Sequence, residues 1–153
     1  MENIMGLLKV RVKRGINLVV RDVMSSDPYV TVSMGNLKVK TCVIKKNCNP
    51  EWNEELTLSV TDPSLPIKLD DQMGDAEIDI RPYLECLEMG LENLPTPTTI
   101  RRFYPSKDNC LADESAVVWQ NGKITQELTV RLRNVETGEV ELQLYWIDLR
   151  DSK

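Results

Sequence analysis

Apolar and basic residues alternate near the start of the chain. In LLKVRVKRG (7–15), single lysines or arginines separate the leucine and valine positions. This period of two is typical of a β-strand with one buried and one exposed face. Similar alternation or short apolar runs predict further strands in residues 27–34, 37–44, 56–60, 65–69, 75–80, 127–135 and 139–149.

Turn signals separate these stretches. Gly35-Asn36 and Asn121-Gly122 are dipeptides typical of tight hairpin turns. KKNCNPEWNEE (45–55) predicts a turn because asparagine and proline interrupt it. Strands that recur about every 8–12 residues with short turns between them favour a β-sandwich.

Residues 82–94 depart from the strand pattern. Their leucines follow helical spacing, with Pro82 near the start and Gly90 as an interruption, which predicts a short helix. Residues 96–115 show no periodicity and are expected to be irregular.

The length of 153 residues suits a single domain, 1–153, with its own hydrophobic core. No apolar run approaches the ~20 residues that span a bilayer, and the N-terminal sequence does not follow the pattern of a secretion signal. We therefore expect a cytoplasmic or nuclear protein. Its four cysteines form no C-x-x-C pair and are expected to be free thiols.

Histidine is absent from the chain. Its absence excludes Ser-His and Cys-His nucleophilic catalysis and most zinc sites. Catalysis by carboxylates alone or by lysine stays open, but we expect a binding module and not an enzyme.

The net charge of the chain is −5, but its N-terminal third is basic. Lys38, Lys40, Lys45 and Lys46 follow one another along one predicted strand and its end. They either contact anionic lipid, where each lysine contributes about 1 kcal/mol, or only keep an outer sheet face soluble. Nucleic-acid binding is disfavoured, because the aromatic residues make up 5% of the chain and are not interleaved with the basic ones.

Paired aspartates occur in two predicted loops. Asp22 and Asp27 lie in VVRDVMSSDPYVTV, and Asp70 and Asp71 lie in LDDQMGD. Loop carboxylates are the hard oxygen ligands that calcium prefers, and loops at one end of a sandwich can converge on an ion. The alternative is that Asp27 only begins a turn before the following proline and that the acidic loops are solvated.

Four motifs together resemble a C2 domain. They are the strand that ends in Asp22, SDPYV (26–30), NPEWNE (49–54) and MGDAEI (73–78). The chain order, with RGINL first and EVELQLYWI last, is similar to the type II arrangement. PYLECLEMGLENLP, NCLADESAVVW and ELTVRLRNVETGEVELQLYWIDL further resemble the small plant single-C2 proteins called C2-domain abscisic-acid-related (CAR) proteins, a family that includes GTPase-activating proteins.

The resemblance covers nearly the whole chain. It implies an all-β fold, an antiparallel eight-stranded β-sandwich of type II topology, with a short helical or irregular insertion at about 81–123. It also implies a calcium-dependent adaptor that binds anionic phospholipid and recruits abscisic-acid receptors to the plasma membrane. Some members stimulate a YchF-type GTPase, and the family has nuclear and membrane pools.

Two alternatives to the adaptor remain open. The chain is primarily a GTPase-activating regulator, or it is a calcium-independent scaffold for protein interactions. For the first alternative, no arginine can be identified as an arginine finger, although Arg101, Arg102, Arg131 and Arg133 are available.

The family pattern also implies a set of calcium ligands. The first-loop aspartates correspond to Asp22 and Asp27, with the carbonyl of Arg21 as a further oxygen. A third-loop aspartate corresponds to Asp71, beside Asp70. Calcium takes six to eight oxygens, so the set needs more ligands than these.

An Asp-x-Asp pair that the family carries in its third loop has no counterpart in this chain. Leu69 passes directly to Asp70. Either the loop is shortened, or part of it is absent from the printed sequence. Without the pair we expect weak calcium binding, and we expect lipid binding to depend more on the lysines and to be sensitive to salt.

Overall fold

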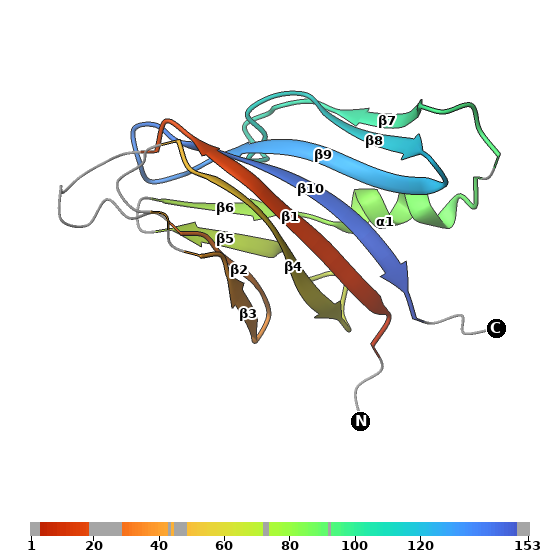
Figure 1. The fold of residues 1–153 in the computed structure, drawn as a ribbon, viewed down its shortest axis with the longest axis horizontal. Helices are drawn as coiled ribbons and strands as arrows, with labels where there is room; N and C mark the ends of the chain where they lie inside the picture. The colour runs from red at the N-terminus through yellow and green to blue at the C-terminus, as the bar shows by residue number, and fades with distance from the viewer. Residues whose placement is uncertain are drawn as a thin grey trace.

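The protein folds as a sandwich of two β-sheets with one short helix (Figure 1). The computed structural model describes residues 4–18, 29–42, 44, 49–71, 74–91 and 93–149. Their elements are β1 (Gly6–Ile16), β2 (Thr31–Met34), β3 (Leu37–Lys40), β4 (Glu51–Val60), β5 (Ile67–Asp71), β6 (Gly74–Ile78), α1 (Arg81–Glu88), β7 (Thr98–Phe103), β8 (Ser115–Gln120), β9 (Lys123–Arg131) and β10 (Glu139–Asp148). A six-stranded sheet in the order β4-β1-β10-β9-β8-β7 faces a four-stranded sheet in the order β3-β2-β5-β6.

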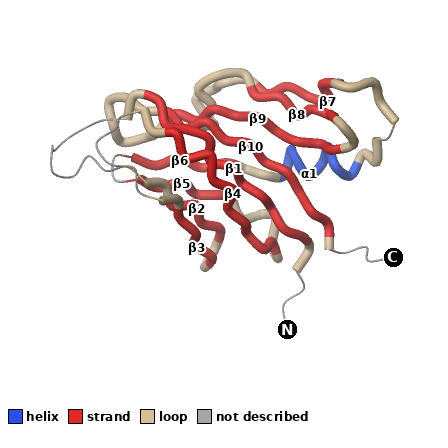
Figure 2. The backbone as a smooth tube through the Cα atoms, in the orientation of Figure 1, coloured by secondary structure: helices blue, strands red, loops and turns tan. Residues whose placement is uncertain are grey.

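The core lies between the two sheets. Leu8, Val10 and Val12 of β1 are fully buried, which confirms the strand that their alternation predicted. β1 pairs with β10 on one side and with β4 on the other, both antiparallel. The first and last strands are therefore neighbours inside the larger sheet, in the chain order expected for the type II arrangement (Figure 2).

The antiparallel sandwich is confirmed, but the expected number of eight strands was wrong, because the described residues form ten. The additional strands, β7 and β8, come from the expected insertion and extend the larger sheet beyond β9. Residues 96–115 looked irregular because Arg101 and Arg102 are both exposed and a bulge shifts the register between Thr99 and Arg101.

β4 begins inside the segment 45–55, so the expectation that this whole segment is a turn was wrong. Trp52 is buried there, and its indole N–H donates a hydrogen bond to the Cys42 C=O at 2.9 Å. Asn53 has a φ of 46°, where the register of β1 with β4 shifts. The asparagine that resembled a turn signal therefore marks a bulge within a strand.

The helix α1 is shorter than the expected range of 82–94. Gly90 adopts a φ of 64°, a left-handed conformation that glycine tolerates and that commonly ends a helix. Pro82 lies in the first turn, where a backbone N–H has no partner within the helix. Tyr83 and Cys86 are fully buried and attach α1 to the core.

β5 and β6 form a tight hairpin where the family resemblance implies a long third loop. β5 runs through Leu69 and Asp70 without a break, and its register with β6 continues to the pair of Asp71 and Gly74. Two residues of the chain connect these strands. The connection between β5 and β6 in this chain is therefore a short hairpin.

Candidate functional site

Three of the expected calcium ligands lie outside the described residues. They are Arg21, Asp22 and Asp27, and their role in binding calcium stays a prediction. The same holds for Lys45 and Lys46, which were expected to contact lipid.

The expectation that Asp70 and Asp71 form a loop pair was wrong, because both are the last residues of β5. Leu69 is buried in the core, and Asp70 is exposed on the outer face of the smaller sheet, as strand alternation requires. Asp70 lies opposite Thr31 of β2 and Asp75 of β6. It is thus presented by a sheet and not by a loop, and its role as a metal ligand stays a prediction.

The carboxylate of Asp75 already has protein partners. Its Oδ2 lies 3.3 Å from the Arg133 guanidinium, and its Oδ1 accepts a hydrogen bond from the Asn134 side chain at 3.1 Å. Asp75 and Arg133 also form an antiparallel backbone bridge. These bonds attach the edge of the smaller sheet to the segment between β9 and β10.

Within the part of the chain that the structure describes, no group of three or more Cys, Asp or Glu side chains could hold a metal ion. A calcium ion needs six to eight oxygen ligands.

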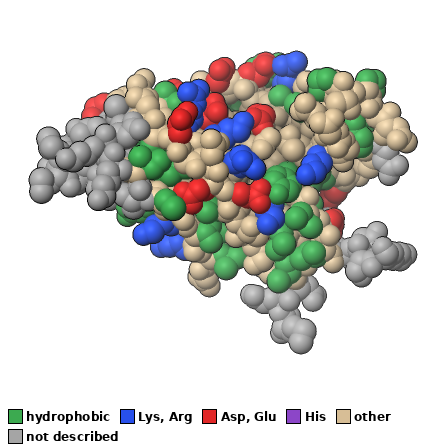
Figure 3. All heavy atoms as spheres, in the orientation of Figure 1, with side chains coloured by type: hydrophobic (Ala, Val, Ile, Leu, Met, Phe, Trp, Pro, Cys, Tyr) green, Lys and Arg blue, Asp and Glu red, His purple; other side chains and the backbone are tan. Residues whose placement is uncertain are grey.

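Basic side chains gather on the outer face of the smaller sheet, near β3. Lys38 and Lys40 are exposed on β3, and Lys68 is exposed on β5. Lys38 and Lys68 flank Ser33 of β2 in the strand register, so their backbones are about 10 Å apart. Figure 3 shows basic side chains over the corner of the molecule where β2 and β3 lie.

Two details of this basic surface were not expected from the sequence. Lys68 was missed, although its position between the apolar Ile67 and Leu69 carried the signal of an outward-facing strand residue. The ammonium of Lys40 also lies 4.9 Å from the centre of the Tyr29 ring, a cation–π contact that orients the lysine.

The outer face of the smaller sheet changes sign from one edge to the other. The β3 edge carries Lys38 and Lys40, whereas the β6 edge carries Asp75 and Glu77. In the register, Lys68 lies opposite Glu77. Positive charge on this face is therefore concentrated at the β3 edge, because the carboxylates of the β6 edge lie near Arg133 and Lys68.

The arginines considered as possible fingers all have partners in the structure. Arg101 bonds to Glu85 at 3.2 Å, and Arg102 bonds to Glu114 at 2.8 Å. Both pairs are exposed, and exposed ion pairs contribute only about 0–1 kcal/mol. These two arginines can therefore be released to a partner at low cost.

Arg131 is held by the fold instead. The Arg131 guanidinium donates hydrogen bonds to three backbone carbonyls of the loop that precedes β8. It cannot leave its site without breaking these structural hydrogen bonds, which disfavours Arg131 as a finger. The side chain of Arg133 bonds to Asp75 in a partly exposed pair that resembles those of Arg101 and Arg102.

Three cysteines are free thiols, as expected: Cys42, Cys86 and Cys110. A hydrogen bond to Glu54, together with the negative charge of that residue, raises the pKa of the exposed Cys42 thiol. Burial raises the pKa of the Cys86 thiol. None of the described helices is long and apolar enough to cross a membrane.

Comparison with known folds supports the sandwich. The structure is similar to the paired C2 domains of calcium-bound extended synaptotagmin 2, with a TM-score of 0.62 and 19% identity, covering 97% of this chain and 48% of that chain. It is also similar to a single C2 domain of a plant extended synaptotagmin 1, with a TM-score of 0.56 and 20% identity, covering 97% of this chain and 99% of the other.

Sequence comparison identifies closer relatives. Protein C2-DOMAIN ABA-RELATED 4 of Arabidopsis thaliana is 56% identical, covering 100% of this chain and 92% of its own length. GTPase activating protein 1 of Oryza sativa subsp. indica is 51% identical, covering 99% of this chain and 97% of its own length.

The family model of the C2 domain matches residues 6–93, more than half of the chain. This match agrees with the observed sandwich and with the near-complete coverage of the plant relatives. The chain therefore belongs to the C2-domain ABA-related family of C2-domain proteins.

Proposed function

We propose that the protein is a peripheral adaptor that binds anionic phospholipid through the β3 edge of its smaller sheet. The observation that supports this proposal is that Lys38, Lys40 and Lys68 are exposed on the outer face of that sheet. Lys38 and Lys68 flank Ser33 of β2, and Lys40 lies opposite Thr31 of the same strand. Each lysine near an anionic membrane contributes about 1 kcal/mol. Lys45 and Lys46 follow β3 in the sequence and would add to the same attraction.

Calcium contributes less in this proposal than the lysines do. Asp22, Asp27 and the carbonyl of Arg21 would supply first-loop oxygens, and Asp71 would add one from the hairpin. This set falls short of the six to eight oxygens of a complete site. The affinity for calcium would then be in the millimolar range or weaker.

The names of the relatives support a signalling role for the adaptor. One is called ABA-related and another a GTPase activating protein. We infer that the chain recruits abscisic-acid receptors to the plasma membrane and that it divides between cytoplasm, membrane and nucleus. The exposed Arg101 and Arg102 favour a second candidate function, stimulation of a YchF-type GTPase.

Sedimentation with phosphatidylserine vesicles tests the lipid proposal. The double variant Lys38→Glu/Lys40→Glu is expected to sediment at least tenfold less strongly than the original chain, because two attractions become repulsions. Lys107→Glu is the matched control, since Lys107 is exposed in the loop before β8. Equal sedimentation of the double variant and the original chain would contradict the proposal.

A further inference from the structure

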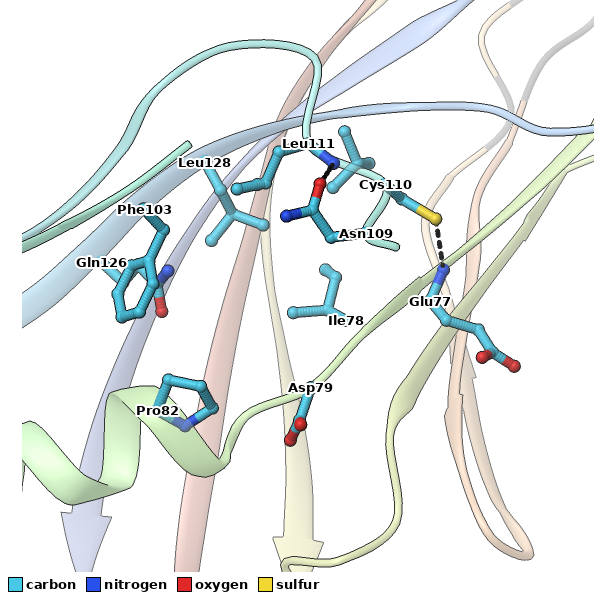
Figure 4. Close-up of a pocket in the computed structure, with 11 residues that line it drawn as sticks. Glu77, Ile78, Asp79, Pro82, Phe103, Asn109, Cys110, Leu111, Gln126 and Leu128 are labelled. Atoms are coloured by element: carbon cyan, nitrogen blue, oxygen red, sulfur yellow. Dashed lines mark hydrogen bonds between the residues drawn. The ribbon is translucent and has the colours of Figure 1, made fainter. Parts of the chain in front are cut away.

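A partly enclosed apolar pocket lies beside the edge of β6 that does not pair with β5 (Figure 4). Its volume is about 130 Å³, close to the ~150 Å³ of an apolar protein cavity that accommodates benzene. One leucine or phenylalanine side chain would therefore fill it. The apolar lining consists of Ile78, Pro82, Phe103, Leu111, Leu128 and Val130.

One wall of the pocket is held rigidly by Arg131. Its guanidinium donates to the carbonyls of Ser106 at 3.0 Å and Asn109 at 2.7 Å, and also to the carbonyl of Leu111. The Asn109 side chain in turn accepts a hydrogen bond from the Leu111 N–H at 3.1 Å. The pocket is thus formed before a ligand arrives, which lowers the conformational cost of binding.

Backbone N–H and C=O groups of β6 also lie next to the pocket. Asp75 bonds to Arg133 through its backbone, on the side away from β5, so Glu77 directs its own backbone groups to that side as well. The Glu77 N–H meets the Cys110 sulfur at 3.5 Å, a weak hydrogen bond (Figure 4). No described residue donates to the Glu77 C=O, so this carbonyl is left to accept one N–H of a bound peptide.

Two carboxylates lie at the mouth of the pocket. They belong to Glu77 and Asp79, and both residues are exposed. Lys68 lies opposite Glu77 in the strand register but is not among the residues that line the pocket. Asp79 is paired with Arg81 at 2.9 Å, whereas the Glu77 carboxylate has no ion pair among the described residues. No lysine or arginine belongs to the described lining of the pocket. A basic group next to an apolar anchor would therefore be favoured there.

We propose that this pocket binds an extended peptide segment of a partner protein, with one leucine- or phenylalanine-sized anchor flanked by basic residues. The anchor fills the apolar pocket, a basic side chain faces Glu77, and a peptide N–H bonds to the Glu77 C=O. This inference rests on the proposed adaptor function, because it gives the chemistry of the protein side of the adaptor. β6 lies at the opposite edge of the smaller sheet from β3, so the peptide and an anionic membrane that meets the β3 edge can be bound at once.

Fluorescence anisotropy with a fluorescein-labelled pentapeptide, Thr-Arg-Phe-Arg-Thr with blocked ends, tests the proposal. We expect saturable binding below about 1 mM peptide. A peptide with alanine in place of phenylalanine should bind at least tenfold more weakly, because the buried anchor is lost. Glu77→Lys should also weaken binding at least tenfold, whereas Glu88→Lys, the same change on the exposed end of α1, should not.

Thiol labelling of the original chain gives a readout without any substitution. Cys110 lines the pocket and Cys42 does not. The peptide should slow iodoacetamide labelling of Cys110, measured by peptide mass mapping, and leave labelling of Cys42 unchanged. Unchanged labelling of Cys110, or equal binding of the alanine peptide, would overturn the proposal. Binding of benzene or indole without binding of the peptide would overturn it as well.

Vesicle sedimentation separates this inference from the lipid proposal. The Glu77→Lys variant should no longer bind the peptide but should still sediment with phosphatidylserine vesicles. If the original chain sediments with vesicles but does not bind the peptide, the inference about the pocket is wrong and the lipid proposal stands. If it binds the peptide but not the vesicles, the lipid proposal is wrong.

Discussion

Asp75 on β6 and Arg133, which follows β9, bond to each other through both backbone and side chains. The backbone N···O distances are 3.2 and 2.6 Å, and the Arg133 guanidinium lies 3.3 Å from the Asp75 carboxylate. Gly74 packs against the same segment, where a Cβ atom would come within 2.7 Å of the Arg133 C=O. The two sheets are thus joined directly beside the short hairpin between β5 and β6.

Replacing Asp75 by alanine is expected to lower the free energy of unfolding by about 1 kcal/mol, measured by urea denaturation. The substitution removes hydrogen bonds to Arg133 and Asn134 that are partly exposed, so the loss is moderate. Glu77→Ala is the control on the same strand and should change stability by less. Equal losses in the two variants would show that the Asp75 side chain adds nothing to the backbone bridge.

Trp52→Phe tests the anchor between β4 and the segment after β3. The substitution keeps an aromatic ring in the core and removes the indole N–H that bonds to the Cys42 C=O. We expect a loss of about 1–3 kcal/mol in the free energy of unfolding, because a partly buried carbonyl is left without its donor. Trp119→Phe provides the comparison at a half-buried tryptophan of β8. A larger loss at Trp119 than at Trp52 would contradict this assignment.

The strands with a strict period of two were predictable from the sequence. β1 and β10 followed the alternation of their buried residues almost to the end. β7 was not predictable, because it is an edge strand whose Arg101 and Arg102 both face solvent around a bulge. β4 was misjudged at Asn53, where the residue type signals a turn but the neighbouring Trp52 is held in the core.

The basic surface was only partly predictable. Lys38 and Lys40 followed from the spacing within one strand, whereas Lys68 joins them only through the register of β2 with β5. The pocket beside β6 could not be predicted at all. Its lining comes from four separate segments, and one wall depends on Arg131, which gave no sequence signal beyond its charge.

The raised pKa of the Cys42 thiol predicts how alkylation of this cysteine depends on pH. Glu54 favours the protonated thiol and raises its pKa, so the reactive thiolate appears at higher pH than for a free cysteine. Glu54→Gln should shift the pH profile of Cys42 alkylation to lower pH. Glu51→Gln, a substitution at the exposed start of the same strand, should leave the profile in place. A shift to higher pH in the Glu54 variant would contradict the assignment.

The double variant Arg101→Ala/Arg102→Ala tests the second candidate function. An arginine finger contributes roughly 10³–10⁵ to the rate of GTP hydrolysis. If one of these residues acts in that way, stimulation of a YchF-type GTPase should fall at least about hundredfold, with vesicle sedimentation unchanged. Unchanged stimulation would exclude both arginines as fingers. Lys107→Ala serves as the control for loss of a positive charge nearby.

We propose that lysines, and not calcium, provide most of the attraction of this protein to anionic membranes. The decisive experiment is sedimentation of the original chain with phosphatidylserine vesicles, in calcium or in a calcium chelator, at low and at high salt. We predict that the bound fraction falls steeply with salt, since the Debye length shortens from ~30 Å at 0.01 M to ~10 Å at 0.1 M. We also predict that adding about 0.1 mM calcium changes the bound fraction of the protein little. Binding that requires calcium at this concentration and resists salt would contradict the claim.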